Sequence, residues 1–135
     1  MAKKVSKAVS RDETRAILTG ILFVIDGHTM RMVATDSYRL AVAETMLETV
    51  DSNDMEIVVP GRALEEATRL ATGAETVVLG TSENQVVFSF GETTFVTRRI
   101  EGTFPNYKQL IPAQTETVVT VQTDEFLAAV KRVSL

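Results

Sequence analysis

Several residue types that support common chemistries are scarce in this chain. Its 135 residues contain no cysteine and no tryptophan, and the only histidine is His28. Without cysteine there is no disulfide framework and no thiolate metal site. A single imidazole with no second histidine at ligand spacing gives no zinc site. His28 falls in a predicted turn, where a solvated side chain is a simpler interpretation than a base or a ligand.

Long apolar runs are also missing. No segment approaches the roughly 18 apolar residues that a membrane-spanning helix needs. Lys3 and Lys4 are followed by a mixed polar segment and not by the apolar stretch of a secretory signal. Apolar residues make up 44% of the chain and charged residues 24%, which is typical of a globular protein with a core of its own. We therefore expect a globular protein in the cytoplasm.

Catalytic motifs are absent as well. The chain has no glycine-rich phosphate loop and no Gly-x-Ser-x-Gly elbow. Its acidic residues are scattered, whereas two-metal catalysis needs clustered carboxylates. Asp36 and Ser37 would need His28 to complete a triad, so a structural corner is the better interpretation. We expect no catalytic residues, no metal and no cofactor. A small hydrolase or isomerase would need an acid–base pair, and the sequence offers only lone carboxylates.

Charge is distributed unevenly along the chain. The net charge is −4, yet residues 1–11 carry four basic and no acidic residues, so the remainder holds −8. A basic segment on an acidic body attracts phosphates locally. The alternative is that these charges belong to the solvated face of a helix.

The hydrophobic pattern predicts an α+β fold. Helices are expected at 2–13, at 62–72 and from Asp124, as N-cap, to the C-terminus. Strands are expected at 19–25, 29–35, 38–45, 55–59, 75–80, 85–90, 93–99 and 117–122. The apolar stripes of the first two helices are Ala2, Val5, Ala8 and Val9, and Leu64, Ala67, Leu70 and Ala71.

The stretch from 18 to 44 organises the predicted fold. Ile21, Phe23 and Ile25 share one face of its first strand, and the dipeptide at 26–27, Asp-Gly, supplies the chemistry of a tight turn. The small polar residues at 35–37 predict a corner before the third strand. The order of elements then repeats as a strand, a helix and three strands, which favours helices on one side of the sheets.

Four sequence blocks resemble one protein family. They are LTGILF at 18–23, VATDSYRLA at 33–41, VVPGRAL at 58–64 and IEGTFPNY at 100–107. Each is weak alone, but in this order they span nearly the whole chain. On these residues the chain resembles the middle domain of the bacterial DNA polymerase III beta subunit, the sliding clamp.

The resemblance implies a DNA-clamp fold of repeated β-α-β-β-β units, with helices on one face of antiparallel sheets. Residues 1–112 would be the middle domain without its first strand, and residues 113–135 would begin the third domain. The chain would then be a piece of a longer protein, and its segment 113–135 would replace the missing strand in a second copy. The intact homodimer would encircle duplex DNA as a non-catalytic processivity subunit of the polymerase, a nucleotidyltransferase.

The resemblance also implies a groove for short Leu-Phe-containing peptides of polymerase III alpha and clamp-loader subunits. Carried over by position, its lining is Leu18, Thr35, Ser37, Tyr38, Arg39, Leu40, Pro105 and Leu110. Two departures from the family affect partner preference: Ser37-Tyr38 replaces the usual Gly-His, and Gln109 stands where some relatives have Arg. The alternative for the three leucines is simple core packing.

For DNA, the resemblance points to basic residues on helices that line the hole of the ring. These are Lys3, Lys4, Lys7, Arg11, Arg62, Arg69, Lys131 and Arg132. No stacking aromatic residues accompany them, which argues against single-strand recognition. A competing interpretation is a stand-alone α+β peptide-binding adaptor without a DNA role. It predicts that neutralising the basic segment changes nothing about DNA association.

Overall fold

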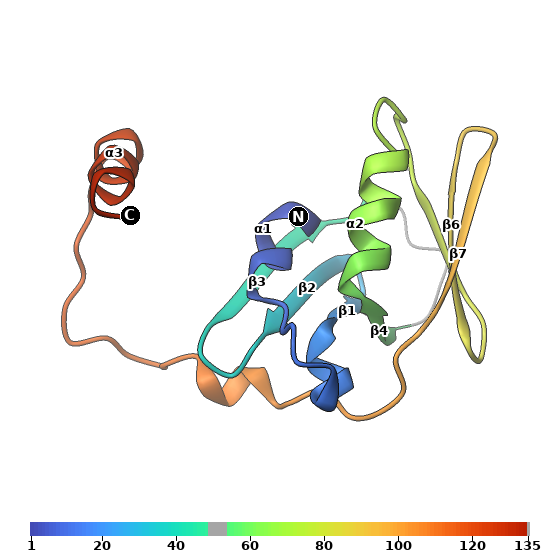
Figure 1. The fold of residues 1–135 in the computed structure, drawn as a ribbon, viewed down its shortest axis with the longest axis horizontal. Coiled ribbons are helices and arrows are strands. Elements are labelled where there is room, and N and C mark those ends of the chain that lie inside the picture. The colour runs from blue at the N-terminus through green and yellow to red at the C-terminus, as the bar shows by residue number, and fades with distance from the viewer. Residues whose placement is uncertain (49–53, 135) are drawn as a thin grey trace. The chain divides into compact units, whose positions relative to one another are not determined.

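The computed structural model describes residues 1–48 and 54–134. The chain divides into two compact units, Met1–Pro105 and Asn106–Leu135 (Figure 1). The first unit holds both sheets and two of the helices, and the second holds a short turn and one helix.

The first sheet consists of four antiparallel strands in the order β3-β2-β1-β4. They are β1 (Gly20–Asp26), β2 (Thr29–Thr35), β3 (Leu40–Met46) and β4 (Met55–Pro60). The predicted turn lies between β1 and β2, where Gly27 has a φ of +53° and donates its N–H to the Asp54 carboxylate at 3.1 Å. All four strands were predicted within two residues. The third begins at Leu40 and not at 38, because the corner extends to Arg39.

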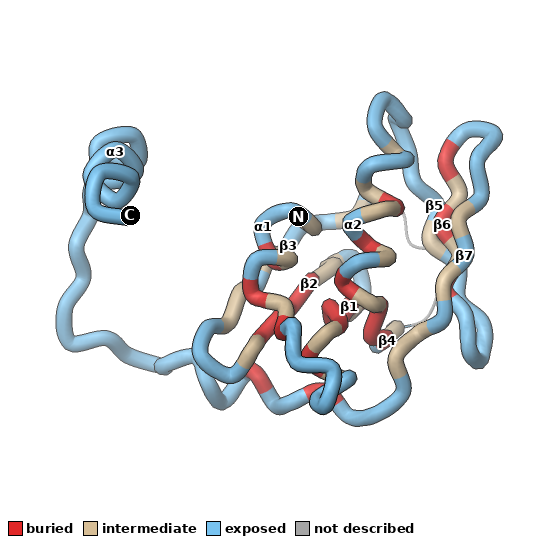
Figure 2. Tube along the Cα trace, viewed as in Figure 1, coloured by how far each residue is buried: buried red, intermediate tan, exposed pale blue. Residues whose placement is uncertain are grey.

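The larger core cluster lies on one face of this sheet. Ile21 and Phe23 are 0% and 2% exposed and pack with Met32 of β2 and Val59 of β4. Side chains two residues apart on a strand share a face, and Ile21 and Phe23 belong to one core cluster, as predicted. Leu22 between them, on the other face, is also buried, at 3% exposed. Figure 2 shows the buried residues concentrated on β1, β2 and β4.

The predicted helix over residues 2–13 was wrong in extent. Helix α1 covers only Ala2–Val5, a 3₁₀ turn follows at Ser6–Ala8, and Val9 is extended. Ser10 explains the break, since its N–H donates to the Leu18 carbonyl at 2.9 Å and its hydroxyl accepts the Asp12 N–H at 3.1 Å. Local serine bonds of this kind compete with a helix. A second 3₁₀ segment, η2, then runs over Glu13–Thr19.

The second half of the first unit repeats the pattern of the first. Helix α2 (Gly61–Leu70) precedes β5 (Val78–Thr81), β6 (Gln85–Phe90) and β7 (Thr93–Arg98), which form a sheet in the order β5-β6-β7. Leu64 and Ala67 are buried as predicted, but Leu70, placed on the same stripe, is 38% exposed because it ends the helix. Each three-stranded meander thus follows a helix, as the repeat predicted.

Two predictions for the second unit were wrong. Residues 117–122 form no strand, since no strand within residues 1–48 and 54–134 pairs with them. Helix α3 (Thr123–Val133) is capped at Gln122, so Asp124 lies in the first turn and is not the N-cap. The Asp124 carboxylate still interacts favourably with the helix dipole there. The predicted loop at 100–112 contains a 3₁₀ turn, η3 (Tyr107–Leu110). In residues 1–48 and 54–134, no helix has both the length and the apolarity to cross a membrane.

Candidate functional site

The predicted corner between β2 and β3 is held by its own small side chains. Thr35 is 3% exposed, its hydroxyl donates to the Arg39 carbonyl at 2.8 Å, and it accepts the Ser37 N–H at 3.1 Å. These two bonds close the loop across its base. The corner is therefore a defined turn that presents the side chains at 37–39 to solvent.

Asp36 fixes the other side of the corner. Its Oδ1 accepts the N–H groups of Tyr38 and Arg39 at 3.0 Å each, and its Oδ2 accepts Arg39 Nε at 2.9 Å. The backbone N–H groups of Arg39 and Tyr38, followed by the Arg39 guanidinium, hold the pKa of Asp36 at about 2, below its ordinary 3.8. A carboxylate whose two oxygens accept these hydrogen bonds has a structural role in the corner. His28 lies at the opposite end of β2, so the triad interpretation fails on geometry.

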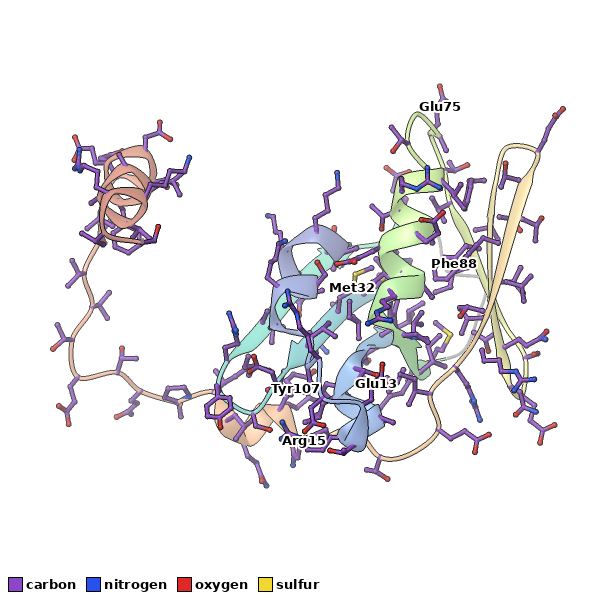
Figure 3. All side chains as sticks on the ribbon, viewed as in Figure 1. Glu13, Arg15, Met32, Glu75, Phe88 and Tyr107 are labelled. Atoms are coloured by element: carbon purple, nitrogen blue, oxygen red, sulfur yellow. The ribbon has the colours of Figure 1, made fainter. Side chains whose placement is uncertain are left out.

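Arg15 contacts the corner from η2, and no sequence pattern predicted this contact. Its guanidinium donates through Nη1 to the Ser37 hydroxyl at 2.7 Å and through Nη2 to the Asp36 carbonyl at 3.4 Å. Figure 3 labels Arg15 on η2. Ser37 has a φ of +78°, a conformation that costs energy for a residue with a side chain. The Arg15 bond helps to offset that strain.

The predicted groove residues fall into distinct environments. Residues 35–40 meet at the corner, where Tyr38 is 95% exposed and Leu40 is half-buried. Leu18 is 5% exposed at the end of η2, which fits the core-packing alternative for this leucine. Pro105 is exposed at the end of the first unit. Leu110, in the second unit, is 60% exposed in η3.

The corner makes a specific pH prediction. Because the folded-state pKa of Asp36 lies below the unfolded value, its contribution to stability is present above about pH 4 and is lost as the pH falls toward about 2. Asp36→Asn should lower the urea midpoint at neutral pH. The wild type and the variant should converge as the pH approaches 2, measured by urea unfolding across this range. A constant difference at every pH would show that Asp36 does not act through its charge.

The predicted DNA-facing residues are distributed over several elements. Lys3 and Lys4 lie on α1, but Lys7 lies in the 3₁₀ turn and Arg11 in the connection after it, because the first helix is short. Helix α1 packs beside α2, which carries Arg62 and Arg69. Lys131 and Arg132 lie in the last turn of α3, in the second unit.

Three of these cations share one cleft. Lys7, Arg11 and Arg62 line a cleft of about 380 Å³, together with Glu13 and Glu65. Arg69 lies apart from it in an ion pair with Glu66, whose Oε1 is 2.5 Å from Nη2. That hydrogen bond lowers the pKa of Glu66. The cleft is the part of the basic set best placed to hold a phosphate, since within residues 1–48 and 54–134 neither Arg11 nor Arg62 forms an ion pair.

Comparison with known proteins identifies the family. The model of the DNA polymerase III beta subunit central domain matches residues 1–106. The chain belongs to the DNA polymerase III beta subunit family. The resemblance found in the sequence blocks is therefore confirmed.

Individual members of the beta subunit family agree with this assignment. The beta sliding clamps of Staphylococcus aureus (strain Mu50) and Bacillus subtilis (strain 168) are each 36% identical over 129 residues, 95% of this chain. The match covers 34% of each relative, so the chain spans about a third of their length.

Solved structures of the beta subunit family share the fold. The Bacillus subtilis DNA polymerase sliding clamp superposes with a TM-score of 0.93 at 33% identity, covering 99% of this chain and 36% of that one. The Thermotoga maritima beta subunit gives 0.86 at 26% identity, covering 98% and 36%. The predicted α+β clamp fold is confirmed.

Proposed function

We propose that this chain is the central part of a DNA sliding clamp, the processivity factor of the bacterial replicative polymerase. The observation that carries the proposal is the match of residues 1–106 to the beta subunit central domain, with the same fold as the Bacillus subtilis sliding clamp. In the proposed role the chain catalyses no reaction. The complete protein, a homodimeric ring, encircles duplex DNA and tethers the polymerase by avidity.

The domain assignment belongs to the same proposal. Residues 1–112 form the middle domain of the clamp, and residues 113–135 begin the third. The division of the chain into compact units at Pro105 and Asn106 supports a boundary in this region. The turn η3, which contains the proposed groove residue Leu110, then lies near the end of the middle domain.

Weak attraction to the phosphate backbone is the proposed mode of DNA contact. The cleft formed by Lys7, Arg11 and Arg62 brings three cations from different elements to one surface. Glu13 and Glu65 offset part of their charge. Such a surface attracts a duplex of any sequence without holding it tightly, which suits a ring that slides.

The corner at 35–40 is the proposed site for client peptides of polymerase III alpha and clamp-loader subunits. Tyr38 stands out into solvent on a turn whose backbone is fixed by Thr35 and Asp36. Leu40 begins the adjoining strand half-buried and offers an apolar wall. A rigid corner loses little conformational entropy when a short peptide binds.

A charge-removal experiment tests the DNA role. In the triple variant Lys7→Ala, Arg11→Ala, Arg62→Ala, the negative slope of log Kobs against log salt should become shallower by about 2 to 3, because each lost phosphate contact contributes about 0.9. The readout is fluorescence anisotropy of a labelled duplex, with the 135-residue chain and with the chain extended to the length of its relatives.

The matched control removes the same charge elsewhere. Arg98→Ala, Arg99→Ala, Lys108→Ala changes three cations that lie outside the proposed DNA-facing set. Its salt slope should equal that of the wild type. If both triple variants behave like the wild type, the chain has no DNA role at this cleft, and the peptide-binding adaptor becomes the better function.

A further inference from the structure

Ser37 has a backbone conformation that is unfavourable for serine. Within residues 1–48 and 54–134 it is the one residue other than glycine with a positive φ, at +78°. Side chains disfavour this region because Cβ comes too close to a carbonyl oxygen, whereas glycine adopts it freely. The Ser37 side chain therefore adds strain to the corner that glycine would not. Strain of this kind persists where the surrounding structure enforces it, and it gathers at functional sites.

The Ser37 hydroxyl also makes a bond that glycine could not make. It accepts Nη1 of Arg15 at 2.7 Å, and the Asp36 carbonyl accepts Nη2 of the same guanidinium at 3.4 Å. On the side of η2, Nε donates to Asp12 Oδ2 at 3.3 Å (Figure 3). All three nitrogens of the guanidinium are thus engaged. We call the contacts of Arg15 with Ser37 and Asp36 the clasp.

The clasp joins two segments that carry proposed groove residues. Arg15 lies in η2, which also contains Leu18, and Ser37 lies in the corner that leads to Leu40. The backbone of Arg15 departs from the helical path inside η2, with φ −111° and ψ 64°. Both segments have local bonds of their own. The clasp adds a direct tie between them across 22 positions of sequence.

Stability alone does not explain the clasp. The Arg15 side chain is 43% exposed, and Ser37 is exposed as well. Bonds between exposed side chains contribute little to folding, because water replaces them when they break. The strain at Ser37 acts in the opposite direction. A strained residue with little net gain in stability, at the edge of a proposed binding site, indicates a functional role.

We propose that Ser37 is a positioning residue for client peptides: its hydroxyl holds Arg15 and so keeps the corner in the conformation that receives a peptide. The inference rests on the proposed peptide-binding function. A corner that is fixed beforehand loses little conformational entropy on binding. Without the clasp only a fraction of molecules present the competent corner, and association slows by that fraction. Dissociation is little changed, because the bound peptide itself holds the corner.

Binding kinetics of Ser37→Ala test the proposal. A fluorescent Gln-Leu-x-Leu-Phe peptide is mixed by stopped flow with the chain extended to the length of its relatives. Ser37→Ala should lower the association rate constant about 3- to 10-fold, the effect of losing one hydrogen bond to a charged group. The dissociation rate constant should stay within about twofold of the wild type. The matched control is Ser82→Ala, an exposed serine between β5 and β6, which should keep both wild-type rates.

A double variant separates the clasp from the flexibility of the loop. Ser37→Gly removes the hydroxyl but also frees the backbone, so it should slow association about 3- to 10-fold in the wild-type background. In Arg15→Ala the clasp is already broken. There, Ser37→Gly should change the association rate constant by less than about twofold, because residues that act through one contact are not additive.

The stability of the variants should not follow their binding. Ser37→Gly relieves the positive-φ strain, so its urea midpoint should lie about 0.3 to 1 M above that of Ser37→Ala. Both variants lack the hydroxyl, so both should associate with the peptide equally slowly. A merely structural role for Ser37 would instead make the less stable variant the slower one.

The outcomes that contradict the proposal are distinguishable. If the wild type shows no saturable binding, the proposed peptide site fails, and the positioning role fails with it. If the wild type binds and Ser37→Ala associates equally fast, only the positioning role is wrong. Equal effects of Ser37→Gly with and without Arg15 would place the cause in loop flexibility. Faster dissociation at an unchanged association rate would make Ser37 a direct peptide contact.

Discussion

Phe23→Ala should destabilise the first unit by about 3 to 5 kcal/mol, the largest single-residue loss expected in this chain. Phe23 is 2% exposed and lies at the centre of β1, with Met32 beside it on β2 and Ile57 on β4. Its ring also borders a cavity of about 760 Å³ in the first unit. Truncation therefore removes buried apolar surface and enlarges a space that its neighbours do not fill.

The stability lost in Phe23→Ala is large compared with the total free energy of unfolding. A domain of this length has a free energy of unfolding of about 5 to 15 kcal/mol, so Phe23→Ala removes a large fraction of it. Urea unfolding followed by circular dichroism should show a lower midpoint with an unchanged slope.

The control for Phe23→Ala is an exposed aromatic residue of the same unit. Tyr38→Ala removes a ring that is 95% exposed, and its free energy of unfolding should stay within about 0.5 kcal/mol of the wild type. If the two variants lost similar stability, the core would not be centred on β1 as the burial pattern indicates.

Strands and turns were predictable where one short stretch determined them. The Asp-Gly turn and the alternation of Ile21 and Phe23 are local signals, and the structure contains both. The break in the first helix depends on a bond from Ser10 to Leu18, eight positions along the chain, which helical periodicity does not register. Residues 117–122 have the composition of a strand, but a strand exists only where a partner accepts its hydrogen bonds.

The corner was predictable in position but not in its support. The small polar residues at 35–37 indicated a turn, and Thr35 and Asp36 form it through bonds within a few residues. Arg15 contacts Ser37 across 22 positions of sequence. A contact of that range follows from the fold and leaves no pattern in the sequence. Charged residues near a predicted corner therefore need the structure before they receive a role.

Leu40→Ala should weaken the binding of a fluorescent Gln-Leu-x-Leu-Phe peptide about 10- to 30-fold. Under the proposed function, Leu40 provides the apolar wall beside the fixed corner, and a buried anchor contact of this kind contributes about 1.4 to 2 kcal/mol. The peptide is titrated against the 135-residue chain and against the chain extended to the length of its relatives. Saturable binding by the wild type is the reference for both.

Two further variants show whether the effect of Leu40→Ala is specific to the corner. Met46→Ala removes an apolar side chain that is 69% exposed at the other end of the same strand, and it should bind the peptide like the wild type. Arg15→Ala deletes the bond to the Ser37 hydroxyl without removing a groove residue, so it should weaken binding by loosening the corner. If Leu40→Ala and Met46→Ala bind equally well, the client peptide does not use the corner. Its site would then have to be sought on another surface of the clamp.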